Sequence, residues 1–159
     1  MKAMEEDLAE LLKEIDNEEK TLQFKQFTNL TAYELGIKLV EAAIEKKLSV
    51  TIDICRGEQQ LFHYALPGTT KDNDEWIKRK NRIVNRFYHS SYYMRIYYKL
   101  LNTTIQEKSY LDPSEYAAYG GAFPIHVQNV GVIGTITVSG LPQKEDHKFV
   151  VDVLKLFLV

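Results

Sequence analysis

The sequence of 159 residues has little of what marks several large classes of protein. Its one cysteine, Cys55, leaves no partner for a disulfide within the chain and excludes a cysteine-rich metal site. No run approaches the ~20 apolar residues that a membrane helix needs. The N-terminal segment is acidic and lacks the apolar centre of a signal peptide. We therefore expect a soluble cytoplasmic protein with no membrane partner.

An excess of basic charge is also missing. The chain carries 20 lysines and arginines against 22 aspartates and glutamates, a formal net charge of −2. Because phosphate neutralisation supplies much of the affinity for nucleic acid, this balance argues against a dedicated nucleic-acid-binding protein. With 45% hydrophobic and 26% charged residues, the composition is that of a globular domain. We predict a single domain over residues 1–159, with residues 1–20 as an N-terminal helical extension.

Strand-like segments occur in two pairs. Residues 49–55 alternate apolar and polar side chains, and residues 60–66 follow after a short turn, which predicts an antiparallel hairpin. Residues 123–129 and 130–139 predict a second hairpin. Helical spacing of apolar residues predicts helices near 8–15, 31–47, 73–101, 113–119 and 143–157. This order favours an α+β fold in which helical layers cover a mostly antiparallel sheet.

Local signals refine the helical segments. Thr31 and Glu34 have the spacing of a capping box, which predicts a helix start. Asp112 before Pro113 predicts another helix start. The serines after His89 predict a bend in the long helix, because their side chains compete for backbone hydrogen bonds. The tyrosines that follow suit a core or an interface, since tyrosine combines a large apolar face with a polar tip.

Four segments are specific enough to indicate a family. They are Trp76–Asn81, Ala118–Ile125, Val130–Pro142 and Glu145–His147. Together with the order of elements, they resemble the GlcG-like family, also called the haem-degrading-domain family, over residues 30–159. The resemblance implies a profilin-like, three-layer α/β/α fold with an antiparallel sheet of about five strands.

The same resemblance implies a ligand class and an assembly. Relatives include a haem-binding sensor, a domain fused to corrinoid adenosyltransferases, and proteins encoded with glycolate oxidase. Members of the family often assemble as even-numbered rings or larger oligomers. The resemblance therefore implies a homo-oligomer and makes haem a candidate cofactor, without assigning an activity to this chain.

The glycine-marked ends of the second hairpin form one candidate binding region. Gly120, Gly121 and Gly140 would let the backbone approach a ligand, and with Ser139 they would present amide groups to an anion. Alternatively, these residues are needed for tight turns and for close packing of the backbone.

Charged and aromatic residues extend this candidate region. Arg79 or Lys80 would hold a carboxylate, such as a haem propionate or a small organic acid, unless they belong to a solvated or salt-bridged helix face. Phe123, Asp146 and His147 lie near the ends of the hairpin strands. Asp146 would also cap or neutralise the start of the last helix.

The four histidines are His63, His89, His126 and His147. None of them forms a closely spaced ligand pair, so we predict no metal site. A single imidazole nevertheless suffices to ligate haem axially. His89 is the best candidate for a buried polar role, whereas His63 and His126 are expected to make structural hydrogen bonds within strands.

Signals for nucleophilic catalysis are weak, and no catalytic residue is assigned. Ser139 does not lie in a Gly-x-Ser-x-Gly elbow. Cys55 is either a thiol whose pKa the neighbouring Arg56 lowers, or a small buried hydrophobic residue.

Three functions remain open from the sequence. The first is an oligomeric protein that binds haem, another tetrapyrrole or a small organic acid. The second is an enzyme of haem or small-acid metabolism, and the third is a protein-assembly adaptor without a small ligand. The candidate ligand-binding residues are Arg79, Lys80, His89, Gly120, Gly121, Phe123, Ser139, Gly140, Asp146 and His147.

Overall fold

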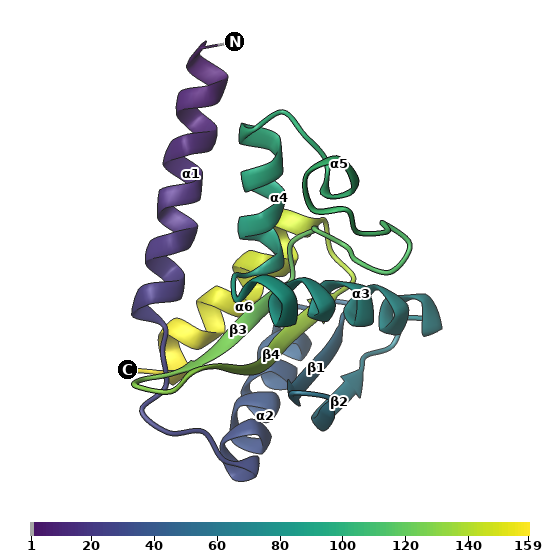
Figure 1. Ribbon diagram of the computed structural model, residues 1–159. Helices are drawn as coiled ribbons and strands as arrows, with labels where there is room; N and C mark the ends of the chain where they lie inside the picture. The colour runs from purple at the N-terminus through teal and green to yellow at the C-terminus, as the bar shows by residue number, and fades with distance from the viewer. Residues whose placement is uncertain (1) are drawn as a thin grey trace.

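A sheet of antiparallel strands lies at the centre of the computed structural model, which describes residues 2–159 (Figure 1). The strands are β1 (Thr51–Arg56), β2 (Gln59–Ala65), β3 (Ala122–Val127) and β4 (Gly131–Ser139). The helices are α1 (Lys2–Thr21), α2 (Asn29–Glu45), α3 (Lys71–Phe87), α4 (Ser91–Leu100), α5 (Ile105–Ser109) and α6 (Gln143–Phe157). The predicted α+β fold with helices on both faces of the sheet is confirmed.

The sheet has the strand order β2-β1-β4-β3, so the two predicted hairpins meet through β1 and β4. Residues 2–159 form four strands, whereas the family resemblance implied about five. Phe24 instead makes a single parallel bridge to Val127 at the edge of β3. The bridge stays this short because α1 ends at Thr21 and Thr28 already caps α2.

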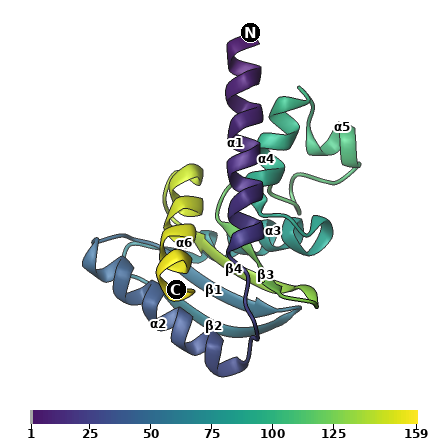
Figure 2. The same cartoon turned by 90° about the vertical axis from the view of Figure 1, so that its left-hand side faces the viewer.

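The two faces of the sheet differ in chemistry. Side chains alternate along a strand, so Ile52 and Ile54 lie on the face opposite to Asp53. The first face is apolar and is covered by α2 and α6, as Figure 2 shows for α2 beneath the sheet. The fully buried residues of this apolar layer come from the sheet, α2 and α6, and they include Leu35, Leu39, Val50, Ile52, Ile54, Ile136, Val138, Val150 and Leu154. Each such side chain stabilises the fold by roughly 1.5–3 kcal/mol relative to exposure.

The second face of the sheet is polar and lies against α3. It carries the buried residues Thr51, Asp53, Thr135, Thr137 and Ser139. Buried polar groups need hydrogen-bond partners, and α3 supplies several of them from its own polar side chains. Asn73 donates to Ser139 at 3.3 Å, and Asn81 accepts from Thr137. The layer between α3 and the sheet is therefore held by hydrogen bonds as well as by packing.

The predicted long helix over residues 73–101 is two helices. α3 ends at Phe87, and its C-cap Tyr88 has a left-handed backbone with φ 60°. Ser90 then caps α4, because its hydroxyl accepts the backbone N–H of Tyr93 at 3.0 Å. The bend expected near His89 is thus a complete break between helices.

The predicted helix starts at Thr31 and Asp112 are wrong. The cap of α2 is Thr28, with Thr31 as its reciprocal partner inside the first turn. Asp112 accepts the N–H of Ser114 at 2.9 Å and closes a turn that does not continue as a helix. The turn ends there because the next backbone N–H, that of Ala117, donates to the carbonyl of Arg79 on α3 at 3.1 Å.

The helix α1 stands beside α4, and its N-terminal end projects beyond the rest of the protein (Figure 2). Ile15 is fully buried there against Tyr92 and Ile96 of α4. Leu8, Leu11 and Leu12 pack onto the same cluster while remaining partly exposed. The N-terminal helix is thus attached through a small apolar cluster of its own.

We expect Gly36→Ala to destabilise the protein, by about 1–3 kcal/mol of unfolding free energy. A Cβ at Gly36 would overlap the ring of Phe62, so α2 packs flush against this ring of β2. Helix propensity alone predicts the opposite sign, a gain of up to about 1 kcal/mol. Urea unfolding measures the difference, and Gly36→Ala combined with Phe62→Leu should recover much of the loss. A stabilised Gly36→Ala variant would contradict the close packing.

Candidate functional site

Lys80 and Asp146 form a buried ion pair near the end of β4. The Lys80 Nζ lies 3.1 Å from the Asp146 Oδ2, and the two side chains are 4% and 2% exposed. The same Nζ donates to the backbone carbonyl of Val138 at 3.3 Å. The other carboxylate oxygen accepts the N–H of Leu141 at 2.9 Å. This pair ties α3 to the start of α6 across the end of the sheet.

Burial acts against both charges of this pair. It raises the pKa of Asp146, a shift that Lys80 and the backbone N–H groups of Leu141 and Gly140 oppose. It lowers the pKa of Lys80, a shift that Asp146 opposes. A buried ion pair is costly to break, because removing one partner leaves an uncompensated charge in the interior. Lys80 and Asp146 are thus partnered within the protein.

The predicted glycines and Ser139 surround this ion pair. Gly121 has φ 139°, and a Cβ there would lie 2.7 Å from the Lys80 Nζ. The N–H of Gly120 donates to the Gln143 side chain at 3.0 Å. Gly140 has φ 148° and lies against the backbone of Ser49. The structure therefore brings these glycines together with Lys80 and Asp146, in close packing and with the Gly120 amide bonded inside the protein.

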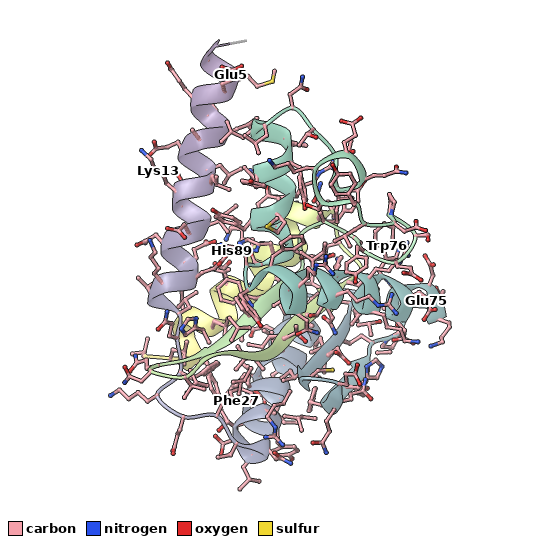
Figure 3. The ribbon with its side chains drawn as sticks, viewed as in Figure 1. Glu5, Lys13, Phe27, Glu75, Trp76 and His89 are labelled. Atoms are coloured by element: carbon pink, nitrogen blue, oxygen red, sulfur yellow. The ribbon has the colours of Figure 1, made fainter. Side chains whose placement is uncertain are left out.

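Arg79 does not join this cluster. Its guanidinium lies over the ring of Trp76, 4.3 Å from the centroid, and its Nε donates to the carbonyl of Glu75 at 3.3 Å. Successive residues on a helix point about 100° apart, so Arg79 and Lys80 face different surroundings. Figure 3 labels Glu75 and Trp76 at the N-terminal end of α3.

His89 and His147 both bind glutamates of α1. The His89 Nδ1 lies 2.8 Å from the Glu19 Oε1, and the His147 Nε2 lies 2.8 Å from the Glu18 Oε1. The other oxygen of Glu19 accepts the N–H of Ser90 at 3.0 Å. These bonds fasten the C-terminal half of α1 to the rest of the protein.

The surroundings of the two histidines differ. His147 is 5% exposed and lies among the rings of Tyr92 and Phe123. Phe123 is itself fully buried in the core. His89 is partly exposed and stacks on Tyr93, with ring centroids 3.8 Å apart and planes at 7°. Figure 3 shows His89 between α1 and α4. Among the predicted site residues, His89 is thus in a position to meet a ligand.

His89 lines a hollow of about 310 Å³, which we call the aromatic hollow. The other residues that form its wall include Phe87, Tyr93, Met94, Tyr97 and Lys108. In residues 2–159, the Nε2 of His89 has no hydrogen-bond partner. The aromatic hollow therefore combines a free imidazole nitrogen, a largely apolar wall and one cation at its rim.

A second hollow of about 610 Å³ lies between the β1–β2 hairpin and α3, and we call it the polar groove. Its floor contains Asp53, Cys55, Gln60 and His63, and its wall is formed by residues 71–85 of α3. No binding role for Asp53, Gln60 or His63 was predicted from the sequence. The signal was present, since Asp53 and Cys55 alternate with buried isoleucines and so point away from the apolar core.

Asp53 is the centre of a hydrogen-bond network in the polar groove. It is 3% exposed and accepts from the Gln60 Nε2 at 2.6 Å and from the Asn81 Nδ2 at 3.3 Å. The Cys55 thiol donates to it at 3.1 Å, and the His63 Nδ1 lies 3.4 Å away. A buried carboxylate is stable only with such partners. The network fixes the side chains that surround the groove.

The pKa of the Cys55 thiol is raised to about 12, first by burial and then by the charge of Asp53. The alternative in which Arg56 lowers this pKa is therefore wrong. The Arg56 guanidinium is directed instead to the side chains of Asn29 and Gln59, at 2.7 Å and 3.4 Å. Cys55 acts as a hydrogen-bond donor rather than as a thiolate.

Neither a metal cluster nor a membrane span is found where the structure describes the chain. Its described residues hold no group of three or more histidine, cysteine, aspartate or glutamate side chains suited to a metal ion. No helix within residues 2–159 is both long and apolar enough to cross a membrane.

The protein is an α+β domain whose antiparallel sheet lies between helical layers, and it carries two hollows. Residues 27–155 match the model of the family described as haem degrading protein HbpS-like. The match spans most of the chain, and the protein belongs to this family. The predicted resemblance is confirmed.

Individual relatives agree with this assignment. A UPF0303 protein of Streptomyces coelicolor is 51% identical over 145 residues, which cover 91% of this chain and 92% of the relative. The crystal structure of the Ybr137w protein has a TM-score of 0.85 at 36% identity, covering 92% of this chain and 86% of that one. A structure of PduOC in complex with haem has a TM-score of 0.67 at 15% identity, covering 83% and 94%, and shows a shared fold.

We expect Asp146→Ala to destabilise the protein by about 3–5 kcal/mol, because it leaves the Lys80 charge buried without its partner. Urea unfolding followed by circular dichroism measures the loss. Asp152→Ala is the matched control, since it breaks the exposed pair with Lys148 on the same helix and should have a much smaller effect. Equal losses in the two variants would contradict a structural role for the buried pair.

We expect Cys55 to react slowly with iodoacetamide at pH 8 in the native protein. Raising the thiol pKa from 9.0 to about 12 reduces the reactive thiolate by roughly a thousandfold. Mass spectrometry of alkylated protein gives the rate, and urea-unfolded protein is the reference. Asp53→Asn should accelerate the native reaction, because it removes a negative charge beside the thiol. A native rate equal to the unfolded rate would disprove the raised pKa.

Proposed function

We propose that the protein is an oligomeric ligand-binding protein that holds haem or a related tetrapyrrole in the aromatic hollow. The observation that carries the proposal is the state of His89, whose Nδ1 is bonded to Glu19 while its Nε2 is left open. The description of the family as haem degrading protein HbpS-like supports the ligand class. The haem complex of the structural neighbour PduOC is consistent with it.

The bond to Glu19 prepares His89 for axial ligation. A carboxylate on one imidazole nitrogen fixes the tautomer and the ring orientation, and it increases the basicity of the other nitrogen. Glu19 is 8% exposed and is itself held by the N–H of Ser90. The imidazole is therefore supported on one side by a fixed acceptor and on its face by the ring of Tyr93.

The remaining wall suits the other parts of a tetrapyrrole. Phe87, Met94 and Tyr97 offer apolar contact to a flat macrocycle, and Lys108 offers a cation to a propionate. Bound haem would supply an iron centre, and the Nε2 of His89 would be the protein group that holds it. A hollow of about 310 Å³ encloses part of such a ligand, so a second copy of the chain covering its outer face would complete the site. This supports the homo-oligomer implied by the family.

We expect haemin titration to give a saturable Soret shift that depends on His89. His89→Ala should weaken binding by at least about tenfold, since it removes the axial bond. Glu19→Gln should have a smaller effect, because the amide still accepts a hydrogen bond but lacks the charge. His63→Ala is the matched control, since His63 lies in the polar groove. Equal affinity of the wild type and His89→Ala would disprove this site.

Ascorbate added to the complex separates the proposed binding protein from a haem-degrading enzyme. A binding protein keeps its Soret band under reductant, whereas turnover bleaches it. Light scattering with size-exclusion chromatography, with and without haemin, measures the assembly. A monomer in both conditions would contradict the oligomeric part of the proposal.

A further inference from the structure

The polar groove is separate from the aromatic hollow. The two share no lining residue, and α3 lies between the hairpin that floors the groove and the break at residues 88–90. The groove exists because α3 packs mainly on β4 and β3 and leaves the polar face of the β1–β2 hairpin uncovered (Figure 1). A concave surface with fixed polar groups is a candidate ligand site.

The acidic and basic side chains in the polar groove are equal in number. Asp53 and Glu58 lie on the hairpin side, whereas Lys71, Lys78 and Arg82 lie on α3. Adding Asp74 of α3 gives equal numbers of acidic and basic side chains in the lining. The carboxylates would repel a purely anionic ligand, and the basic side chains would repel a purely cationic one. The lining therefore suits a ligand that carries both charges at a distance from each other.

Asp74 is the carboxylate at the N-terminal end of the α3 wall, and its side chain is 26% exposed. Its Oδ1 is buried and makes no hydrogen bond within residues 2–159, although it lies 3.4 Å from the His63 Nε2. A buried carboxylate oxygen without a donor is unfavourable, because it has lost water without replacement. The other oxygen, Oδ2, forms only a long ion pair with the Lys71 Nζ at 3.8 Å, and a ligand ammonium would bind the carboxylate through this oxygen.

Arg82 provides open donors at the other end of the wall. Its Nη1 donates to the carbonyl of Glu115 at 2.9 Å, and in the described chain no other hydrogen bond holds its guanidinium. A guanidinium has five N–H groups in a planar fork, which suits a carboxylate. One bond thus positions Arg82 while the rest of the fork stays available.

The spacing of these two residues defines the length of the ligand. Eight residues separate Asp74 from Arg82 on α3, which corresponds to about 12 Å along the helix axis. An extended peptide rises roughly 3.3–3.6 Å per residue, so about three residues span that distance. We propose that the polar groove binds a short peptide of about three residues with both ends free, its ammonium at Asp74 and its carboxylate at Arg82.

Isothermal titration with trialanine tests the proposal. We expect saturable binding, and a loss of at least about tenfold when the peptide is N-acetylated or when its carboxylate is amidated. Alanine alone should bind more weakly than trialanine, because it cannot reach both ends. Absence of trialanine binding, or equal affinity for the capped peptides, would overturn the proposal.

Two variants locate the ends of the peptide. Asp74→Asn should reduce the difference between free and N-acetylated trialanine, and Arg82→Gln should reduce the difference between the free and amidated forms. Glu41→Gln, on the other side of the sheet, is the control and should leave all three affinities unchanged. Haemin titration and circular dichroism of each variant verify that the fold and the aromatic hollow are intact. If neither variant changes its matching difference, the peptide does not bind as proposed.

Discussion

The unequal faces of the sheet are the constraint on which the rest of the structure depends. Because side chains alternate along β1, a strand that places Ile52 and Ile54 in an apolar core must turn Asp53 to the other side. The apolar face is satisfied by close packing with α2 and α6. The polar face needs hydrogen bonds, and α3 provides them to Asp53, Thr137 and Ser139 through Asn73 and Asn81. The polar groove remains where the sheet extends beyond α3.

Hydrogen-bonding capacity separates structural polar residues from those open to a ligand. Lys80 and Asp146 have chemistry suited to anion binding, yet both are used in a buried pair. His89 and His147 have equivalent glutamate partners, at 2.8 Å each, but His147 is enclosed by rings while His89 lines a hollow. Residue type alone therefore does not identify a site in this protein.

The sequence predicted the elements whose signals are local and periodic. Both hairpins and the last helix follow from alternation or helical spacing, and the break near His89 follows from its serines. The polar groove was missed because its residues come from the β1–β2 hairpin and from α3, which the fold brings together. The helix expected after Asp112 stops after one turn, because the N–H of Ala117 donates to the carbonyl of Arg79 on α3, a contact that the local sequence does not reveal. The sequence placed Arg79 beside Lys80, but helical geometry directs them apart.

The neighbouring residues Glu18 and Glu19 give α1 an effect on two distant parts of the protein. One glutamate reaches His89 after the end of α3, and the other reaches His147 in α6. A rigid helix moves as a unit, so a displacement of α1 would strain its bonds to both histidines. The orientation of the imidazole in the aromatic hollow is thereby linked to the seating of the last helix on the sheet. The N-terminal helix thus connects the His89 imidazole with α6 through two hydrogen bonds.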